Sequence, residues 1–232
     1  MEWQPVQKPA EMAERRLLEA ILSKKYPINS TLPAERDLAE QIGVTRPTLR
    51  EALQRLARDS WLDIQHGKPT RVRNYWREGG LAVLAVLAQT PAGQTPDFVT
   101  HLLEFRILLA PAYTRQAIDS AAGEVAALLE SYASLEDNPS VFARADWELH
   151  IRLTQLASNP IFCFLFNGFQ NLSIPVGEQY FAFLACRQHS RYFYADLLNC
   201  ARSEAAFDAE TLTRRIMEES LALWQKMQKE TL

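Results

Sequence analysis

Basic and hydroxyl side chains gather within a six-residue stretch in the N-terminal third of this chain. Arg46 and Arg50 are four residues apart, and Thr45 and Thr48 accompany them. A guanidinium can donate two parallel hydrogen bonds to the O6 and N7 atoms of guanine, and a threonine hydroxyl can bond to a phosphate or a base. On one face of a helix, these side chains could therefore read base edges in the major groove of duplex DNA.

A second group of donors follows at a predicted turn. His66, Lys68 and Thr70 surround Gly67 and form a compact cluster that could enter a minor groove. Arg36 stands upstream, at the start of a predicted short helix, from which it could reach the DNA backbone or a base. Taken alone, His66 could also be an ordinary turn residue, so the cluster as a whole carries the interpretation.

Four other arginines in this region have simpler interpretations. Arg55 and Arg58 fit solvated helix positions or partners of acids on their own helix. Arg71 and Arg73 alternate with apolar residues and fit the outward face of a strand. We do not include these four among the candidate DNA contacts.

The elements that must position the candidate contacts have clear local signals. Hydrophobic spacing predicts helices over residues 11–25 and 34–41. Gly43 suits a helix C-cap, and Thr45 suits the N-cap of a third helix whose first turn tolerates Pro47. The third helix has one apolar stripe, which consists of Leu49, Ala52, Leu53 and Leu56.

Two short segments after this helix alternate apolar and polar residues. They cover residues 61–65 and 70–73 and are predicted to be strands on either side of a hairpin tip at 66–69. Helix, short helix, glycine turn, helix and hairpin is the order of a winged helix-turn-helix. We expect this domain to occupy about residues 1–76.

The charge distribution supports a division of the chain. The whole protein has 25 basic and 28 acidic residues. Residues 1–75 hold 13 basic and 10 acidic residues, a net charge of +3, and residues 76–232 hold 12 and 18, a net charge of −6. A locally basic segment on an acidic body is typical of a DNA-binding module attached to another domain.

The rest of the chain is predicted to be an all-α helical-bundle domain over residues 77–232, so that the fold is mainly α. Leu81, Leu84 and Leu87 fit one helix, and apolar spacing from Phe98 to Leu109 fits another. Further helices are predicted over residues 123–136, 140–157, 160–184, 187–203 and 205–230. Helix starts are predicted at the X-Pro pairs 95–96, 138–139 and 159–160, kinks or interruptions at Pro111 and Pro175, a loop at 89–94, and no strand after residue 75.

Composition excludes several classes of protein. A chain of 232 residues with 47% hydrophobic and 23% charged residues can bury a core, and only 8 glycines argue against a turn-rich β fold. Three cysteines give neither a disulfide framework nor a zinc ribbon. No glycine-rich phosphate loop or nucleophile motif is present, so we do not expect an enzyme.

The sequence gives no signal for export or membrane insertion. Residues 1–9 lack the apolar segment of a signal peptide, and the uncharged run from 153 to 177 is interrupted by prolines and amides, so we interpret it as buried helices. We therefore expect a cytoplasmic protein.

Residues 32–39 and 43–53 together resemble the N-terminal signature of GntR-type bacterial transcription factors, and residues 54–59, 61–62 and 64–70 narrow the resemblance to the FadR type. The resemblance implies a homodimer that binds double-stranded DNA at a palindromic operator of fatty-acid metabolism genes. Pro47 stands where a well-known member has threonine, so this position offers no hydroxyl to the DNA. The implied DNA contacts are Arg36, Thr45, Arg46, Thr48, Arg50, His66, Gly67, Lys68 and Thr70.

FadR-type proteins bind long-chain acyl-CoA in the helical domain and then release DNA, which the resemblance carries over to this chain as an expectation. By spacing alone, the last helix fits an ordinary amphipathic helix better, although its cations and Trp224 would also suit a phosphate-bearing ligand with an apolar tail. Met217 stands where FadR has a glycine next to the ligand, and Ile216 replaces a tyrosine. The positions that match the ligand region of the family are Arg106, Tyr180, Arg214, Ser220, Trp224 and, near the coenzyme A end, Lys229. Beyond this effector we expect no cofactor.

Asp146 and His150 support an alternative, because they are four residues apart on one helix face. Many relatives of the broader class hold a divalent metal with such a pair and two more histidines, and sense small carboxylates through it. Here the two further histidines are missing from residues 192–194 and 216–218. We therefore expect no metal and interpret His150 as a pocket-lining or hydrogen-bonded core residue.

Overall fold

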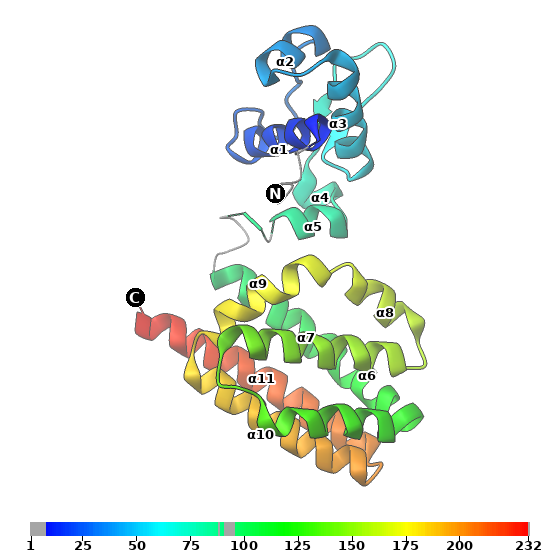
Figure 1. The fold of residues 1–232 in the computed structure, drawn as a ribbon, viewed down its shortest axis with the longest axis vertical. Coiled ribbons are helices and arrows are strands. Elements are labelled where there is room, and N and C mark those ends of the chain that lie inside the picture. Colours follow the sequence, from blue (N-terminus) through cyan, green and yellow to red (C-terminus); the bar gives the residue numbers. More distant parts are fainter. Residues whose placement is uncertain (1–7, 88, 91–95, 232) are drawn as a thin grey trace, which may run out of the picture. The chain divides into compact units, whose positions relative to one another are not determined.

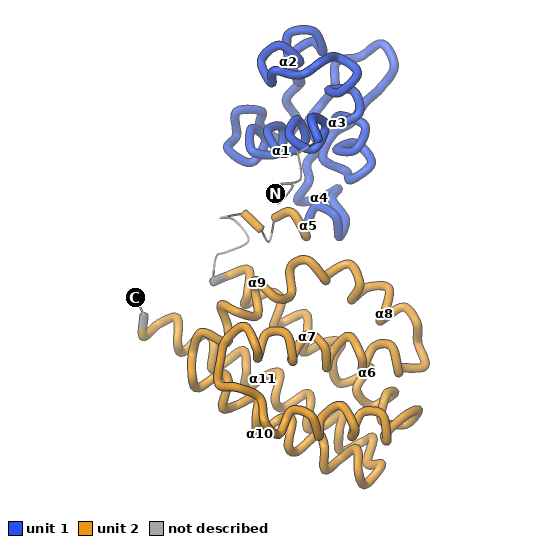
Figure 2. The backbone as a smooth tube through the Cα atoms, viewed as in Figure 1, with its two compact units in different colours: residues 1–84 blue, residues 85–232 orange. Residues whose placement is uncertain are grey.

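The computed structural model describes residues 8–87, 89–90 and 96–231. The chain divides into two compact units, residues 1–84 (unit 1) and residues 85–232 (unit 2), which Figure 2 shows in different colours. Unit 1 combines short helices with a small sheet, and unit 2 is built from helices (Figure 1). The predicted fold class, a winged helix-turn-helix followed by an all-α domain, is confirmed.

Unit 1 contains the predicted winged helix-turn-helix. The strands pair antiparallel with Leu62 opposite Val72, and Thr31 adds a bridge to Arg71 on the other side. Regular pairing covers only two residues of each strand, which is shorter than the alternating sequence indicates. The elements are α1 (Pro9–Leu22), α2 (Glu35–Ile42), α3 (Arg46–Arg58), β1 (Leu62–Asp63), β2 (Arg71–Val72) and α4 (Tyr75–Glu78).

The turn between α2 and α3 follows the local chemistry of its residues. Gly43 ends α2 with φ of 79°, a left-handed conformation that favours glycine. Thr45 caps α3 by accepting a hydrogen bond from the Thr48 N–H. The predicted apolar stripe of α3 is buried against α1, whose Leu17 and Ile21 also lie in the core. The stripe therefore fixes which face of α3 is left to the solvent.

Unit 2 is a bundle in which α6 packs against α7, α10 and α11, and α9 packs on α7 (Figure 1). Helix α5 (Leu81–Leu87) begins in unit 1 and ends in unit 2, because the division of the chain falls after residue 84. The described residues after 75 contain no strand. The elements are α5 (Leu81–Leu87), α6 (Pro96–Ser131), a 3₁₀ turn η1 (Tyr132–Ser134), α7 (Pro139–Leu156), α8 (Pro160–Asn167), α9 (Gln170–Phe181), α10 (Leu184–Arg202) and α11 (Ala206–Thr231).

Three expectations about these helices need correction. Helix α6 continues through Pro111, where we expected a kink or an interruption, and its break in helical dihedrals lies at Ala121 instead; this break separates the two helical segments expected before and after residue 123. Helix α9 likewise continues through Pro175. The single helix expected over residues 160–184 is two helices, because α8 ends at Asn167 and α9 begins at Gln170.

The predicted helix starts at two X-Pro pairs are confirmed. Asn138 Oδ1 accepts from the N–H groups of Ser140 and Val141, and Asn159 Oδ1 accepts from the Ile161 N–H. Thr95 and most of the expected loop at 89–94 lie outside the described residues. Within the described part of the chain, no helix is both long and apolar enough to cross a membrane.

Candidate functional site

Helix α3 presents a polar face whose side chains start at its first residue. Leu49 and Leu53 are buried, whereas Arg46 and Arg50 are exposed on the opposite side. Arg46 makes no hydrogen bond or ion pair with any residue that the structure describes. In helix-turn-helix proteins the N-terminal residues of the motif's second helix, which here is α3, approach the base edges. The first turn of α3 is therefore free to contact a major groove.

Two of the candidate arginines have acidic neighbours. Arg50 Nε lies 2.6 Å from Glu35 Oε2, which ties α3 to the first residue of α2. Arg36 Nε lies 3.1 Å from the carboxylate of the adjacent Asp37. Both arginines remain largely exposed, with side-chain exposures of 68% and 76%. These contacts hold the guanidinium groups over the surface of α2 and α3 without burying them.

The tip of the hairpin is an exposed turn. Gly67 has φ of 74°, which a residue with a side chain rarely adopts, and His66 and Lys68 flank it in the solvent. Lys68 Nζ donates to Gln65 Oε1 at 2.9 Å. Thr70 follows at half exposure. The predicted donor cluster is thus present at one turn of unit 1.

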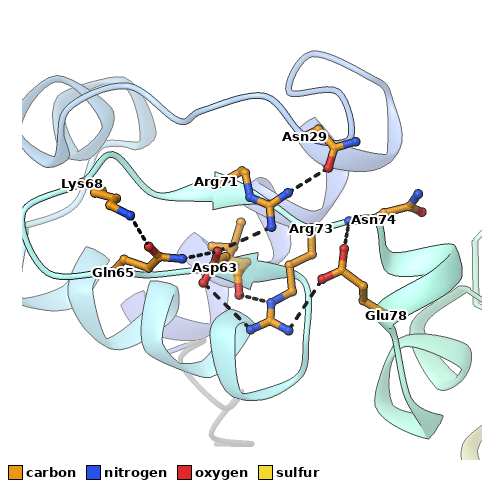
Figure 3. A network of polar contacts seen from close by, with 9 residues as sticks. Asn29, Asp63, Gln65, Lys68, Arg71, Arg73, Asn74 and Glu78 are labelled. Atoms are coloured by element: carbon orange, nitrogen blue, oxygen red, sulfur yellow. Dashed lines mark hydrogen bonds and ion pairs between the residues drawn. The ribbon is translucent and has the colours of Figure 1, made fainter.

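Arg71 and Arg73 do not simply face outward from the wing. Arg71 donates to Asn29 Oδ1 at 2.9 Å, and Arg73 donates to the Leu62 carbonyl oxygen at 3.0 Å. Both guanidinium groups also approach Asp63, as Figure 3 shows. Their charges are therefore neutralised within the domain.

The C-terminal half of α3 supports the simpler interpretation of its arginines. Arg55 Nη2 donates to Glu51 Oε1 at 2.6 Å, one turn earlier on the same helix. The Arg58 guanidinium lies 3.4 Å from the carboxylate of Asp59. Acidic partners on or next to their own helix account for both groups.

Unit 2 contains a partly enclosed cavity of about 80 Å³. Residues of α6, α7 and α9, together with Phe166 of α8 and Phe169, form its walls. The lining is mostly apolar, and its polar members are Arg106, Asp146, His150, Ser173 and Tyr180. An apolar chamber with a few polar groups is typical of a small-molecule site.

The polar members form a network with two tyrosines. Arg106 Nη2 lies 2.9 Å from Asp146 Oδ2, and Tyr194 Oη donates to Asp146 Oδ1 at 3.4 Å. Tyr113 Oη lies 2.6 Å from His150 Nδ1. Burial, reinforced by the positive charge of Arg106, lowers the pKa of His150 from 6.5 to about 3. His150 is therefore neutral, and its role in this network is that of a hydrogen-bonding group.

Three buried polar atoms belong to residues that line the cavity and have no partner with full hydrogen-bond geometry among the described residues. They are Arg106 Nε, His150 Nε2 and Tyr180 Oη, of which the Tyr180 hydroxyl still interacts with Ser220 and Cys186. Burial raises the pKa of Tyr180, so its hydroxyl keeps its proton. A buried donor without a partner costs about 1–3 kcal/mol. A group with oxygen acceptors in the cavity could satisfy such atoms.

The donor set does not fit a metal ion. In the part of the chain that the structure describes, no three His, Cys, Asp or Glu side chains lie close enough together to hold one. The guanidinium of Arg106 already balances the charge of Asp146. His150 Nε2 lies 3.7 Å from Asp146 Oδ1, just beyond hydrogen-bond distance.

Of the expected ligand residues, Arg106 and Tyr180 line the cavity, and Trp224 adjoins it. The ring centroids of Trp224 and Tyr180 are 6.3 Å apart, and Trp224 Nε1 donates to Thr100 Oγ1 at 3.2 Å. Ser220 is buried one turn earlier on α11. Arg214 and Lys229 are exposed on α11, so they do not lie in the cavity. The role of these residues in ligand binding stays a prediction.

Two tyrosines of this network, Tyr113 and Tyr194, were not predicted from the sequence to belong to a site. Tyr113 lies seven residues after Arg106 on α6, a spacing that places the two side chains on one face. That spacing was an available signal. Tyr194 comes from α10, and only the packing of helices brings it to Asp146.

Comparison with protein families gives two matches that together cover nearly the whole chain. A family described as bacterial regulatory proteins of the gntR family matches residues 9–72. A family described as the FadR C-terminal domain matches residues 73–231. The first match covers the helix-turn-helix and its wing, and the second contains the cavity.

Curated relatives match over the full length. The fatty acid metabolism regulator protein of Klebsiella pneumoniae subsp. pneumoniae is 38% identical over 223 residues, which cover 96% of this chain and 93% of the relative. The protein of the same name from Pectobacterium atrosepticum is 40% identical with the same coverage. The solved structure of Lar from Listeria monocytogenes superposes with a TM-score of 0.64 at 16% identity, covering 96% of this chain and 99% of that one. This last likeness concerns the fold alone.

Proposed function

Because the chain belongs to the GntR family of bacterial regulatory proteins and carries a FadR-type C-terminal domain, we propose that it controls fatty-acid metabolism genes in response to long-chain acyl-CoA. In this proposal a homodimer binds a palindromic operator and leaves it when the acyl-CoA binds. Regulators of this family bind DNA and are not enzymes. The palindromic operator, the homodimer and the acyl-CoA effector are what we propose beyond the family membership.

The exposed first turn of α3 supports the DNA-binding half of the proposal. Arg46 and Arg50 can read guanines in the major groove, while Thr45 and Thr48 bond to phosphates or bases. The wing supplies Lys68 as a further cation. Two copies related by a two-fold axis match the two halves of a palindrome, which is why a dimer is expected.

The cavity of unit 2 supports the ligand half, and the single observation that carries it is the set of three buried polar atoms without a well-formed hydrogen bond on residues that line this cavity. Arg106, His150 and Tyr180 can give hydrogen bonds to the carbonyl oxygen of a thioester. The apolar lining accepts the acyl chain. The exposed cations Arg214 and Lys229 on α11 suit the phosphates of coenzyme A.

The size of the cavity suggests how binding changes the protein. A volume of about 80 Å³ is far below the roughly 300–1,000 Å³ of typical ligand sites. A long acyl chain therefore requires the surrounding helices to move apart. Because the ligand binds only the opened state, it shifts the population toward that state. Coupling of about 1–3 kcal/mol, the usual range, changes operator affinity roughly 5- to 150-fold.

Fluorescence anisotropy with a labelled palindromic FadR-type operator tests both halves. We expect tight binding by the wild-type protein, reversed by long-chain acyl-CoA and unaffected by coenzyme A without an acyl chain. Binding that acyl-CoA leaves unchanged would contradict the proposed effector. Failure to prefer the operator over an unrelated duplex would contradict the DNA-binding half.

The variant Trp224→Ala separates the two activities. Trp224 is buried beside Tyr180 in unit 2 and has no place in the proposed DNA contacts. We expect operator affinity close to that of the wild type and a weaker response to acyl-CoA. Equal loss of both activities, together with a changed circular dichroism spectrum, would indicate misfolding, and the milder Trp224→Phe would then replace it.

A further inference from the structure

Asp63, the last residue of β1, is the centre of a polar network in the wing (Figure 3). Its Oδ2 atom accepts a hydrogen bond from Gln65 Nε2 at 2.9 Å. Arg71 Nη2 lies 3.5 Å from the same oxygen, and Arg73 Nη2 lies 4.0 Å from the other oxygen. One carboxylate thus contacts three side chains of the hairpin.

The carboxylate of Asp63 determines the orientation of the Gln65 amide. An ionised carboxylate only accepts hydrogen bonds, so Gln65 must turn its NH₂ group toward Asp63. The Gln65 oxygen then faces the other way and accepts from Lys68 Nζ at 2.9 Å. With the amide reversed, its NH₂ group would face the ammonium, and two donors would meet. A chain of two hydrogen bonds therefore fixes the position of Lys68, whose ammonium keeps two further protons for another acceptor.

The same carboxylate holds Arg71 and Arg73 to the domain, and each arginine has a second anchor. Arg71 Nη1 donates to Asn29 Oδ1 at 2.9 Å, and Arg73 Nη1 lies 3.9 Å from Glu78 of α4. These anchors keep both guanidinium groups away from the tip of the wing. Lys68 is left as the cation that the hairpin tip presents.

We propose that Asp63 is a positioning residue for sequence-specific DNA binding, which orients Lys68 through Gln65 and keeps Arg71 and Arg73 from making non-specific phosphate contacts. This inference rests on the proposed function, in which the wing contacts DNA. Asp63 itself does not touch the DNA.

The proposal predicts effects of opposite sign on two kinds of DNA. An acidic side chain near DNA ordinarily weakens binding to every duplex, because it repels phosphates. Removal of its charge should then strengthen operator and non-operator binding alike. If Asp63 positions Lys68, its removal instead weakens operator binding, while the released Arg71 and Arg73 strengthen binding to unrelated DNA. The ratio of the two affinities distinguishes the two roles.

The test measures the affinity of the full-length protein for an operator duplex and for an unrelated duplex of the same length, at one salt concentration. We expect Asp63→Asn to weaken operator binding about tenfold, a typical effect of one charge-assisted hydrogen bond, with equal or stronger binding to the unrelated duplex. Gln65→Ala, an exposed position with no part in the core, should weaken operator binding in the same way. Asp59→Asn is the matched control, because it removes one acidic charge from unit 1 outside this network.

A double-mutant cycle with Lys68→Ala identifies the path. If Asp63 acts through Lys68, Asp63→Asn has little further effect on operator binding in the Lys68→Ala background. Additive effects, or stronger binding of Asp63→Asn to both duplexes by the same factor, would overturn the proposal. If the wild-type protein does not prefer the operator at all, the proposed function itself fails and this inference fails with it.

Discussion

Tyr113 Oη and His150 Nδ1 lie 2.6 Å apart in the interior of unit 2, where His150 is only 1% exposed. His150 is neutral because its pKa is lowered to about 3, so one of its ring nitrogens carries a hydrogen and the other can accept one. The short contact therefore joins a tyrosine hydroxyl to an uncharged imidazole. The second ring nitrogen, Nε2, makes no hydrogen bond with the described residues and lies 3.7 Å from Asp146 Oδ1.

The first prediction concerns the pH dependence of stability. His150 has a pKa of about 3 when folded and 6.5 as its ordinary value, so the unfolded chain takes up the proton first as pH falls. The contribution of neutral His150 to stability is complete above about pH 6.5 and decreases toward pH 3. We expect a loss of about 2 kcal/mol in the free energy of unfolding between pH 8 and pH 5.

Urea denaturation at both pH values measures this loss in the wild type and in His150→Gln. Glutamine is uncharged over the whole range and still offers an oxygen to Tyr113. The variant should lose about 2 kcal/mol less between the two pH values than the wild type does. Equal losses in the two proteins would show that His150 is not the group that titrates.

The second prediction concerns metals. Because Arg106 already neutralises Asp146 and the described residues offer no third ligand, we expect purified protein to contain far less than one transition metal ion per chain. Elemental analysis by mass spectrometry measures this content. A chelator should leave the response of the operator complex to acyl-CoA unchanged. A stoichiometric metal that is absent from Asp146→Asn would instead favour an effector bound through a metal.

The DNA-binding elements could be predicted from the sequence because their signals are local. Gly43 and Thr45 define the ends of α2 and α3 by themselves, and the apolar stripe of α3 shows which of its faces is buried. The candidate DNA contacts follow from the opposite face. The anchoring of Arg71 by Asn29 could not be predicted in this way, since the two residues are 42 positions apart.

The buried polar network could not be predicted from local sequence signals either, because its members are distant in the sequence. Arg106 and Asp146 meet only because α6 packs against α7. The kink at Ala121 lies between Ser120 and Gly123, whereas Pro111, a usual cause of kinks, lies within continuous helix. Local signals alone therefore do not show which of the two places carries the kink.

The third prediction concerns Met217, which is buried on α11 one turn before Ser220. Met217 does not line the cavity itself, but its position matches one next to the ligand in FadR-type proteins. If the acyl chain runs beside α11, a smaller side chain there gives it more space, so we expect Met217→Ala to shift preference toward longer chains. The same change should lower the free energy of unfolding by about 2–5 kcal/mol, the usual cost of shortening a buried methionine to alanine. Isothermal titration with acyl-CoA of increasing chain length measures the preference. Met227→Ala, half-buried further along α11, is the control, and an unchanged profile in both variants would remove Met217 from the binding site.

The fourth prediction compares two exposed arginines at opposite ends of α3. Arg46, at the N-terminal end, makes no contact with the described residues, whereas Arg58 pairs with Asp59. Loss of a bidentate base contact costs about 1–3 kcal/mol, so Arg46→Ala should bind the operator roughly 5- to 150-fold more weakly and lose its preference over unrelated DNA. Arg58→Ala removes the same charge from the other end of the helix and should change operator affinity less than about threefold.

Anisotropy titrations at two salt concentrations separate loss of specificity from loss of charge, because removal of a phosphate contact weakens binding to all duplexes alike. If the two variants weaken operator binding equally, the N-terminal turn of α3 does not read the bases.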